Sequence, residues 1–164
     1  DIDTYLPNSK ILTNIDIQKY NDIDQIFTKS PKTQYIILLF IDDDKDIRWD
    51  IVTGWWKKKF NIQESDLIWL VEYPSEGLTE YLLSHPEVTH ISLDHDLGKT
   101  EVSSELNKEI WKNYYSFEQA FKDKVVKIHS LNPRGAENIF HKLKEVDEDV
   151  QIVSLLTMAM ELED

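Results

Sequence analysis

The sequence predicts an α/β domain in which a doubly wound, five-stranded parallel sheet is covered by helices on both faces. Short apolar segments alternate along the chain with segments whose apolar residues recur at helical spacing. The connections between the apolar segments are too long for hairpins, as parallel strands require. With 164 residues and 41% hydrophobic content, the chain can also bury one full core.

The strongest strand signal is the continuous apolar run of residues 35–41, which is typical of a strand buried on both faces. The other expected strands are residues 67–71, 88–93, 125–129 and 150–153. Five such strands fit the flavodoxin-like order 2-1-3-4-5. In that order the first and third strands are neighbours, and the switch point lies between their carboxyl ends.

Helical spacing of apolar residues predicts the segments between the strands. The expected helices are residues 47–60, a short one from Ser75 to His85, a long one from Ser103 or Ser104 to Phe121, and one after the N-cap Asn132. Residues 99–102 are expected to form a loop. Residues 157–164 are expected to be a terminal helix or tail.

Residues 1–32 are weakly patterned, and Pro31 marks a boundary. We therefore expect an amino-terminal extension over residues 1–32 that packs on a domain formed by residues 33–164. Within the extension, residues 10–15 resemble a short strand and residues 22–29 a short helix.

The net charge of −13, from 31 acidic residues against 18 Lys and Arg, makes direct nucleic-acid binding unfavourable. It suits a cation site or a protein partner with a basic face. The chain has no cysteine, no apolar run of about 18 residues and no signal-peptide pattern at its start. These features predict a soluble cytoplasmic protein without a membrane span.

Acidic residues follow two of the expected strands at the edge where ligands bind in such sheets. They are Asp42, Asp43 and Asp44 after the first strand, and Asp94 and Asp96 after the third. Carboxylates this close together need a cation or a shared proton, and all-oxygen ligands favour Mg²⁺. His95 and His129 would also allow Mn²⁺ or Zn²⁺. Capping of the next helix would explain one of these acids but not all of them.

Two strings carry a resemblance to a known family: residues 93–98, Leu-Asp-His-Asp-Leu-Gly, and residues 129–136, His-Ser-Leu-Asn-Pro-Arg-Gly-Ala. Over roughly residues 33–155 the chain resembles the receiver domains of response regulators. The two strings resemble a divergent receiver-like group found in bacteriophages and bacterial conflict systems. The resemblance implies that Asp94 matches the phosphoacceptor, Ser130 the hydroxyl, and Asp43 with Asp44 (or Asp42 with Asp43) the acid pair.

One departure from the receiver pattern bears on function. After the fifth expected strand the chain reads Ser154-Leu155-Leu156-Thr157, without the Lys that receivers place there. A phosphoaspartate at Asp94 would lack that cation. Arg134 is a candidate substitute, because it begins a helix whose amino terminus favours anions.

Three functions are open on the sequence. The preferred hypothesis is a receiver-like, non-catalytic acidic binding module, phage-encoded and acting on a host or regulatory protein. The second is a Mg²⁺-dependent phosphohydrolase or phosphotransferase with an Asp nucleophile. The third is an acidic mimic of nucleic acid that inhibits a DNA-binding protein.

Overall fold

A computed structural model describes residues 10–13, 36–43, 47–62 and 67–163 of the chain. Six strands form one parallel sheet, in the order β1-β3-β2-β4-β7-β8. Their bounds are β1 Lys10–Thr13, β2 Ile37–Ile41, β3 Leu67–Val71, β4 His90–Leu93, β7 Val125–Ile128 and β8 Gln151–Ile152. Leaving β1 aside, this is the predicted order 2-1-3-4-5, so the flavodoxin-like fold is confirmed.

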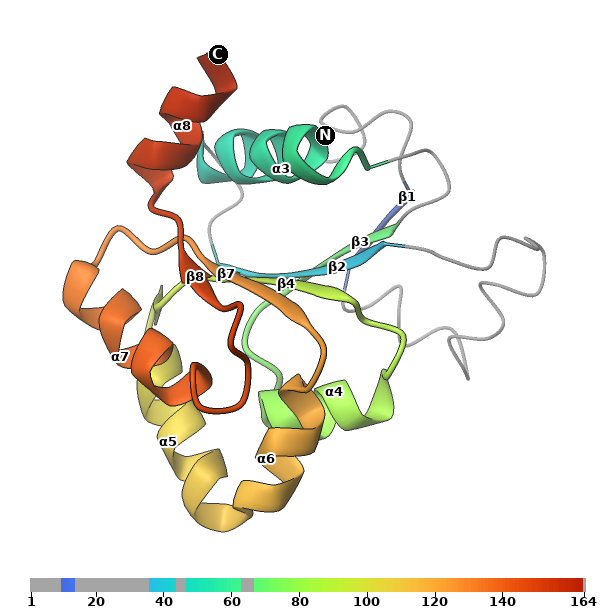
Figure 1. The fold of residues 1–164 in the computed structure, drawn as a ribbon, viewed down its shortest axis with the longest axis vertical. Helices are drawn as coiled ribbons and strands as arrows, with labels where there is room; N and C mark the ends of the chain where they lie inside the picture. Colours follow the sequence, from blue (N-terminus) through green and yellow to red (C-terminus); the bar gives the residue numbers. More distant parts are fainter. Residues whose placement is uncertain (1–9, 14–35, 44–46, 63–66, 164) are drawn as a thin grey trace.

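Helices cover both faces of the sheet (Figure 1). On one face lie α3, Ile47–Phe60, and α8, Leu155–Glu163, which contact each other. On the other face lie four helices. They are α4 Leu78–Ser84, α5 Val102–Lys112, α6 Tyr114–Phe121 and α7 Pro133–Leu143.

Side chains of β2 alternate between two cores, because successive residues of a strand point to opposite faces. Ile37, Leu39 and Ile41 pack with α4, α5, α6 and α7, whereas Leu38 and Phe40 pack with α3 and α8. All five residues of β2 are buried. A central strand that is buried on both faces is what the continuous apolar run predicts.

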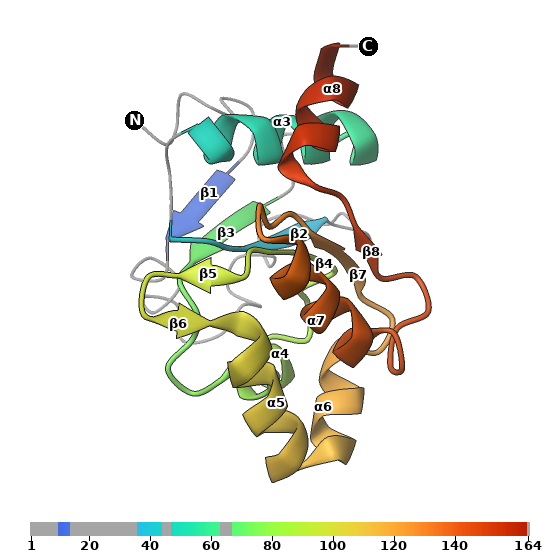
Figure 2. The same ribbon diagram turned by 90° about the vertical axis from the view of Figure 1, so that its left-hand side faces the viewer.

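The region after β4 differs from the sequence-based expectation. Residues 99–102 were expected to form a loop, but a small antiparallel hairpin forms instead, from β5 Asp96–Leu97 and β6 Thr100–Glu101 (Figure 2). The two-residue connection begins with Gly98, whose φ of +64° is a conformation that glycine adopts without strain. The hairpin continues directly into α5.

The long helix expected up to Phe121 is two helices, α5 and α6, because the chain turns at Asn113. The backbone of Asn113 is extended, with φ −164° and ψ 95°. Its N–H still donates to Glu109 O, which ends α5, and its side chain accepts from Ser116 N at 3.1 Å, which caps α6. Apolar periodicity runs through this turn unbroken, so periodicity alone does not reveal it.

The predicted strand at residues 10–15 corresponds to β1, which pairs in parallel with β3 from Lys10↔Leu67 to Thr13↔Leu70. The short helix predicted at residues 22–29 lies outside the described residues. None of the helices in the described ranges is long and apolar enough to cross a bilayer.

Substitution of the α6 cap gives a test of this local structure. Asn113→Ala removes the acceptor for Ser116 N and is expected to lower the free energy of unfolding by about 1 kcal/mol. Asn113→Asp keeps an acceptor and is the matched control, expected to stay close to the wild type. Urea denaturation measures both changes, and an equal loss in the two variants would argue against the cap.

Candidate functional site

The register of the sheet brings together the residues that follow three of its strands. Ile41 of β2 pairs with Leu93 of β4, and Leu93 pairs with Ile128 of β7. Each of these is the last residue of its strand. The next residues, Asp42, Asp94 and His129, therefore leave the sheet in one row at its carboxyl edge, where ligands bind in open α/β sheets.

Asp42, Asp94 and His129 are called here the acid–histidine cluster. Their ligand atoms all lie within 4.8 Å of one another, and the three side chains are buried, with exposed fractions of 1%, 1% and 0%. His129 Nε2 lies 2.9 Å from Asp42 Oδ2. On the other side of the ring, His129 Nδ1 lies 2.8 Å from Ser92 Oγ. Phe40 packs against the same ring, with centroids 5.3 Å apart.

The donor set of the acid–histidine cluster fits a divalent cation. Two carboxylates that converge repel each other, and a cation between them offsets that repulsion. A carboxylate only accepts hydrogen bonds, so His129 directs a ring N–H at Asp42 Oδ2. In that tautomer the nitrogen orients Asp42, whereas an unprotonated Nε2 would offer a third ligand atom. The convergent carboxylate oxygens of Asp42 and Asp94 match the oxygen-ligand chemistry of a Mg²⁺ site.

The other residues expected at the site lie around this cluster. Asp43 is exposed, and its Oδ2 lies 3.9 Å from the position that a Cβ at Gly98 would take. Asp44 is outside the described residues. Ser130 is buried, and its Oγ accepts from Asn132 N at 2.9 Å. Arg134 lies in the first turn of α7, and its side chain is exposed.

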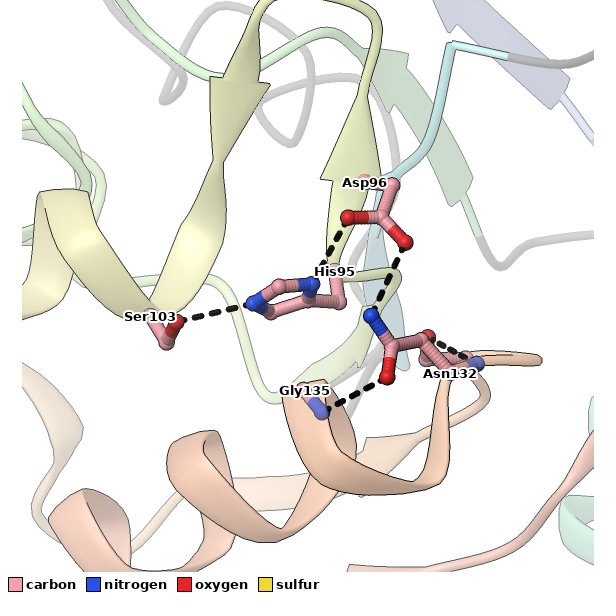
Figure 3. Close-up of polar contacts among 6 residues, drawn as sticks. His95, Asp96, Ser103, Asn132 and Gly135 are labelled. Carbon is pink, nitrogen blue, oxygen red and sulfur yellow. Dashed lines mark hydrogen bonds and ion pairs between the residues drawn. The ribbon is translucent and has the colours of Figure 1, made fainter.

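Asp96 belongs to a second group of side chains, which we call the rim cluster: His95, Asp96, Ser103 and Asn132 (Figure 3). His95 Nδ1 lies 2.9 Å from Asp96 Oδ1, and its Nε2 lies 2.8 Å from Ser103 Oγ. The Asn132 amide donates to the other Asp96 oxygen at 3.3 Å. The expectation that Asp96 joins the same ligand set as Asp42 is not supported by this placement. Asp96, His95 and Glu101 instead form a separate group with convergent ligand atoms.

The rim cluster ties the loop after β4 to the first turns of α5 and α7. Ser103 lies in the first turn of α5, whereas Asn132 is the N-cap of α7 and accepts from Gly135 N at 3.0 Å. A Cβ built at Gly135 would lie 2.4 Å from Cγ and Nδ1 of His95. The His95 ring therefore sits directly against the α7 backbone at Gly135. Because His95 follows Asp94 in the chain, the rim cluster directly adjoins the acid–histidine cluster.

The position where receivers carry a Lys has a different role in this chain. Ser154 Oγ accepts from Thr157 N at 3.1 Å, and Ser154 O accepts from Met158 N at 2.9 Å. Ser154 therefore caps α8. The structure agrees with the sequence that this segment carries no cation for a phosphoryl group.

Sequence reasoning did not identify Ser92 as part of the site. Ser92 is fully buried in the middle of β4, between Ile91 and Leu93. A lone hydroxyl in an apolar strand is a weak signal, because a serine is small enough to be tolerated there without a role. Only its contact with His129, which is 37 residues away in the chain, connects Ser92 to the site.

Comparison with known proteins identifies one family. A family model described as "Cyclic-phosphate processing Receiver domain" matches residues 37–145, which is more than half of the chain. The match begins at β2 and ends just after α7, so it includes the acid–histidine cluster and the rim cluster. Neither the curated proteins nor the solved structures yield a match.

The contact between His95 and Gly135 can be tested with a double-mutant cycle. Gly135→Ala adds a Cβ that the His95 ring must move to accommodate, and we expect it to lower the free energy of unfolding by about 2 kcal/mol. In a His95→Ala background the added methyl group has room. There the same change is expected to be neutral or to stabilise by up to about 1 kcal/mol through helix propensity. An equal loss in both backgrounds would contradict this packing.

Proposed function

Because this chain belongs to the family of cyclic-phosphate processing receiver domains, we propose that it hydrolyses a cyclic phosphate ester at the acid–histidine cluster. The observation that carries the proposal is the convergence of Asp42, Asp94 and His129 within 4.8 Å at the carboxyl edge of the sheet. The family description supplies the substrate class. The sequence alone favours a non-catalytic module, and the buried cluster is our reason to prefer catalysis.

The reaction would convert a cyclic phosphodiester into a phosphomonoester. The oxygen of a water molecule forms a bond to phosphorus, and one ring P–O bond breaks. The proton of the water passes to a carboxylate, for which Asp94 is the candidate, and from there to the departing alkoxide. The balance needs one water and no redox partner. Attack by the Asp94 carboxylate itself, followed by hydrolysis of the acyl phosphate, is the alternative route to the same product.

Asp42 and Asp94 would hold Mg²⁺, with His129 orienting Asp42. When bound, Mg²⁺ supplies charge that offsets the phosphate and polarises a phosphoryl oxygen. Within the chain, Arg134 is a further candidate to contact the phosphate, because its exposed guanidinium lies in the first turn of α7. The amino end of that helix also favours an anion.

Burial of the acid–histidine cluster distinguishes it from a merely acidic surface. Asp42 and Asp94 are each 1% exposed, whereas most acids on a protein with a net charge of −13 lie in water and serve solubility. Acids gathered in one buried row support a catalytic or binding site over an acidic mimic of nucleic acid. A protein partner and a bacteriophage setting stay predictions of the sequence.

Turnover gives the direct test. We expect the protein with Mg²⁺ to open a 2′,3′- or 3′,5′-cyclic nucleotide to its monoester. ³¹P NMR measures this conversion. Asp94→Asn is expected to reduce the rate at least about 100-fold, because it removes both a ligand and the proton acceptor. Asp147→Asn changes a buried acid in the segment between α7 and β8 and is the matched control. Binding of the cyclic ester without turnover would instead favour the non-catalytic module.

Cation binding has its own readout in thermal unfolding. Mg²⁺ at about 100 times its Kd is expected to stabilise the wild type by about 2.7 kcal/mol. Asp94→Asn should lose most of this effect, while its stability in metal-free buffer stays equal or rises, since repulsion from Asp42 is relieved. A large loss of stability for Asp94→Asn in metal-free buffer would argue against charge repulsion between Asp42 and Asp94.

A further inference from the structure

A chain of three hydrogen-bond contacts, which we call the relay, connects α3 to the acid–histidine cluster. Trp56 Nε1 donates to Ser92 Oγ at 2.8 Å, Ser92 Oγ lies 2.8 Å from His129 Nδ1, and His129 Nε2 lies 2.9 Å from Asp42 Oδ2. None of the four side chains is more than 1% exposed. Water therefore does not compete for these contacts, and the direction of each one matters.

The direction of each hydrogen bond follows from which groups can donate a proton and which can only accept one. An indole N–H only donates, so Ser92 Oγ accepts from Trp56, while Asp42 as a carboxylate only accepts, so the proton of that contact is on His129 Nε2. In the part of the chain that the structure describes, the side-chain oxygen of Ser92 contacts no polar group besides Trp56 and His129. Its own proton is therefore directed at His129 Nδ1, which must be unprotonated.

We infer that Trp56 and Ser92 are positioning residues that fix His129 as the neutral Nε2–H tautomer, so that its proton always points at Asp42. The contact between His129 Nε2 and Asp42 Oδ2 then sets the orientation of the Asp42 carboxylate. This inference rests on the proposed function, because it assigns the two residues to the cation site. Partners of this kind set tautomer, orientation and basicity of side chains at metal sites.

Packing alone would not require an indole at position 56. The Trp56 ring stacks on Phe60, with centroids 4.8 Å apart, and meets Trp55 edge to face at 5.5 Å. A phenyl ring keeps an aromatic face for both contacts but loses the N–H together with the volume of the second ring. Trp55→Phe loses the same volume and controls for packing, and Ser92→Ala removes the hydroxyl itself.

The neighbouring residue provides a matched control. Trp55 is also buried on α3, but its Nε1 donates to Glu161 Oε2 on α8 at 2.6 Å and takes no part in the relay. Trp55→Phe makes the same chemical change one residue away. Its effect on overall stability is expected to be comparable, while its effect on His129 should be absent.

The test is ¹⁵N NMR of the imidazole nitrogens at about pH 8, where an unperturbed histidine is neutral. The wild type and Trp55→Phe are expected to show protonated Nε2 and unprotonated Nδ1 for His129. Trp56→Phe and Ser92→Ala are expected to show a measurable share of the Nδ1–H tautomer, because only the contact to Asp42 then favours Nε2–H. Mg²⁺ titration should show a Kd about 10-fold higher in Ser92→Ala than in the wild type.

A protonated Nδ1 in the wild type would overturn the inference, as would the same tautomer state in Trp56→Phe and Trp55→Phe. If Ser92→Ala fails to fold, Trp56→Phe still decides. Neither readout uses a substrate, so failure of the relay and failure of the proposed reaction can be told apart. The expected tautomer and Mg²⁺ affinities without turnover would reject cyclic-ester hydrolysis and leave the assignment of Trp56 and Ser92 standing.

Discussion

The contact between His129 and Asp42 joins the ends of two strands that are not neighbours. Between β2 and β7 lies β4, whose end carries Asp94, so the contact spans the position of the third member of the cluster. This geometry depends on register: a shift of one residue in β7 would turn the His129 side chain to the opposite face of the sheet. The apolar packing of both sheet faces fixes that register and therefore the site.

Much of this arrangement can be predicted from the sequence, because strand ends are easy to locate where an apolar run stops at charged residues. Asp42 and Asp94 follow such runs, and in a doubly wound sheet the strands that precede them are neighbours. The local turns were harder. Asn113 lies within an unbroken apolar periodicity, and the β5–β6 hairpin is too short to produce a pattern. Both depend on backbone conformations that periodicity does not report.

The partners of each side chain were the least predictable part. Asp94 and Asp96 are two residues apart, yet only Asp94 joins Asp42, since Asp96 starts the hairpin and meets His95 and Asn132. Ser92 and Trp56 gain a role only through contacts with residues 36 and 37 positions away in the chain. Spacing rules describe neighbours along one element, so contacts that cross from α3 through β4 to the end of β7 need the folded structure.

Under the proposed function, the net charge gives a cation at Asp42 and Asp94 an electrostatic role in substrate binding. A protein with a charge of −13 repels a phosphate ester before it reaches the site, and salt screens that repulsion only partly over about 8 Å. A cation between Asp42 and Asp94 would reverse the sign of the field locally, where the phosphate must bind. The Lys that receivers carry after the last strand is absent from residues 154–157, where Ser154 caps α8. If the proposed function holds, the affinity for an anionic substrate would depend on the divalent cation more strongly than in a receiver that supplies its own Lys.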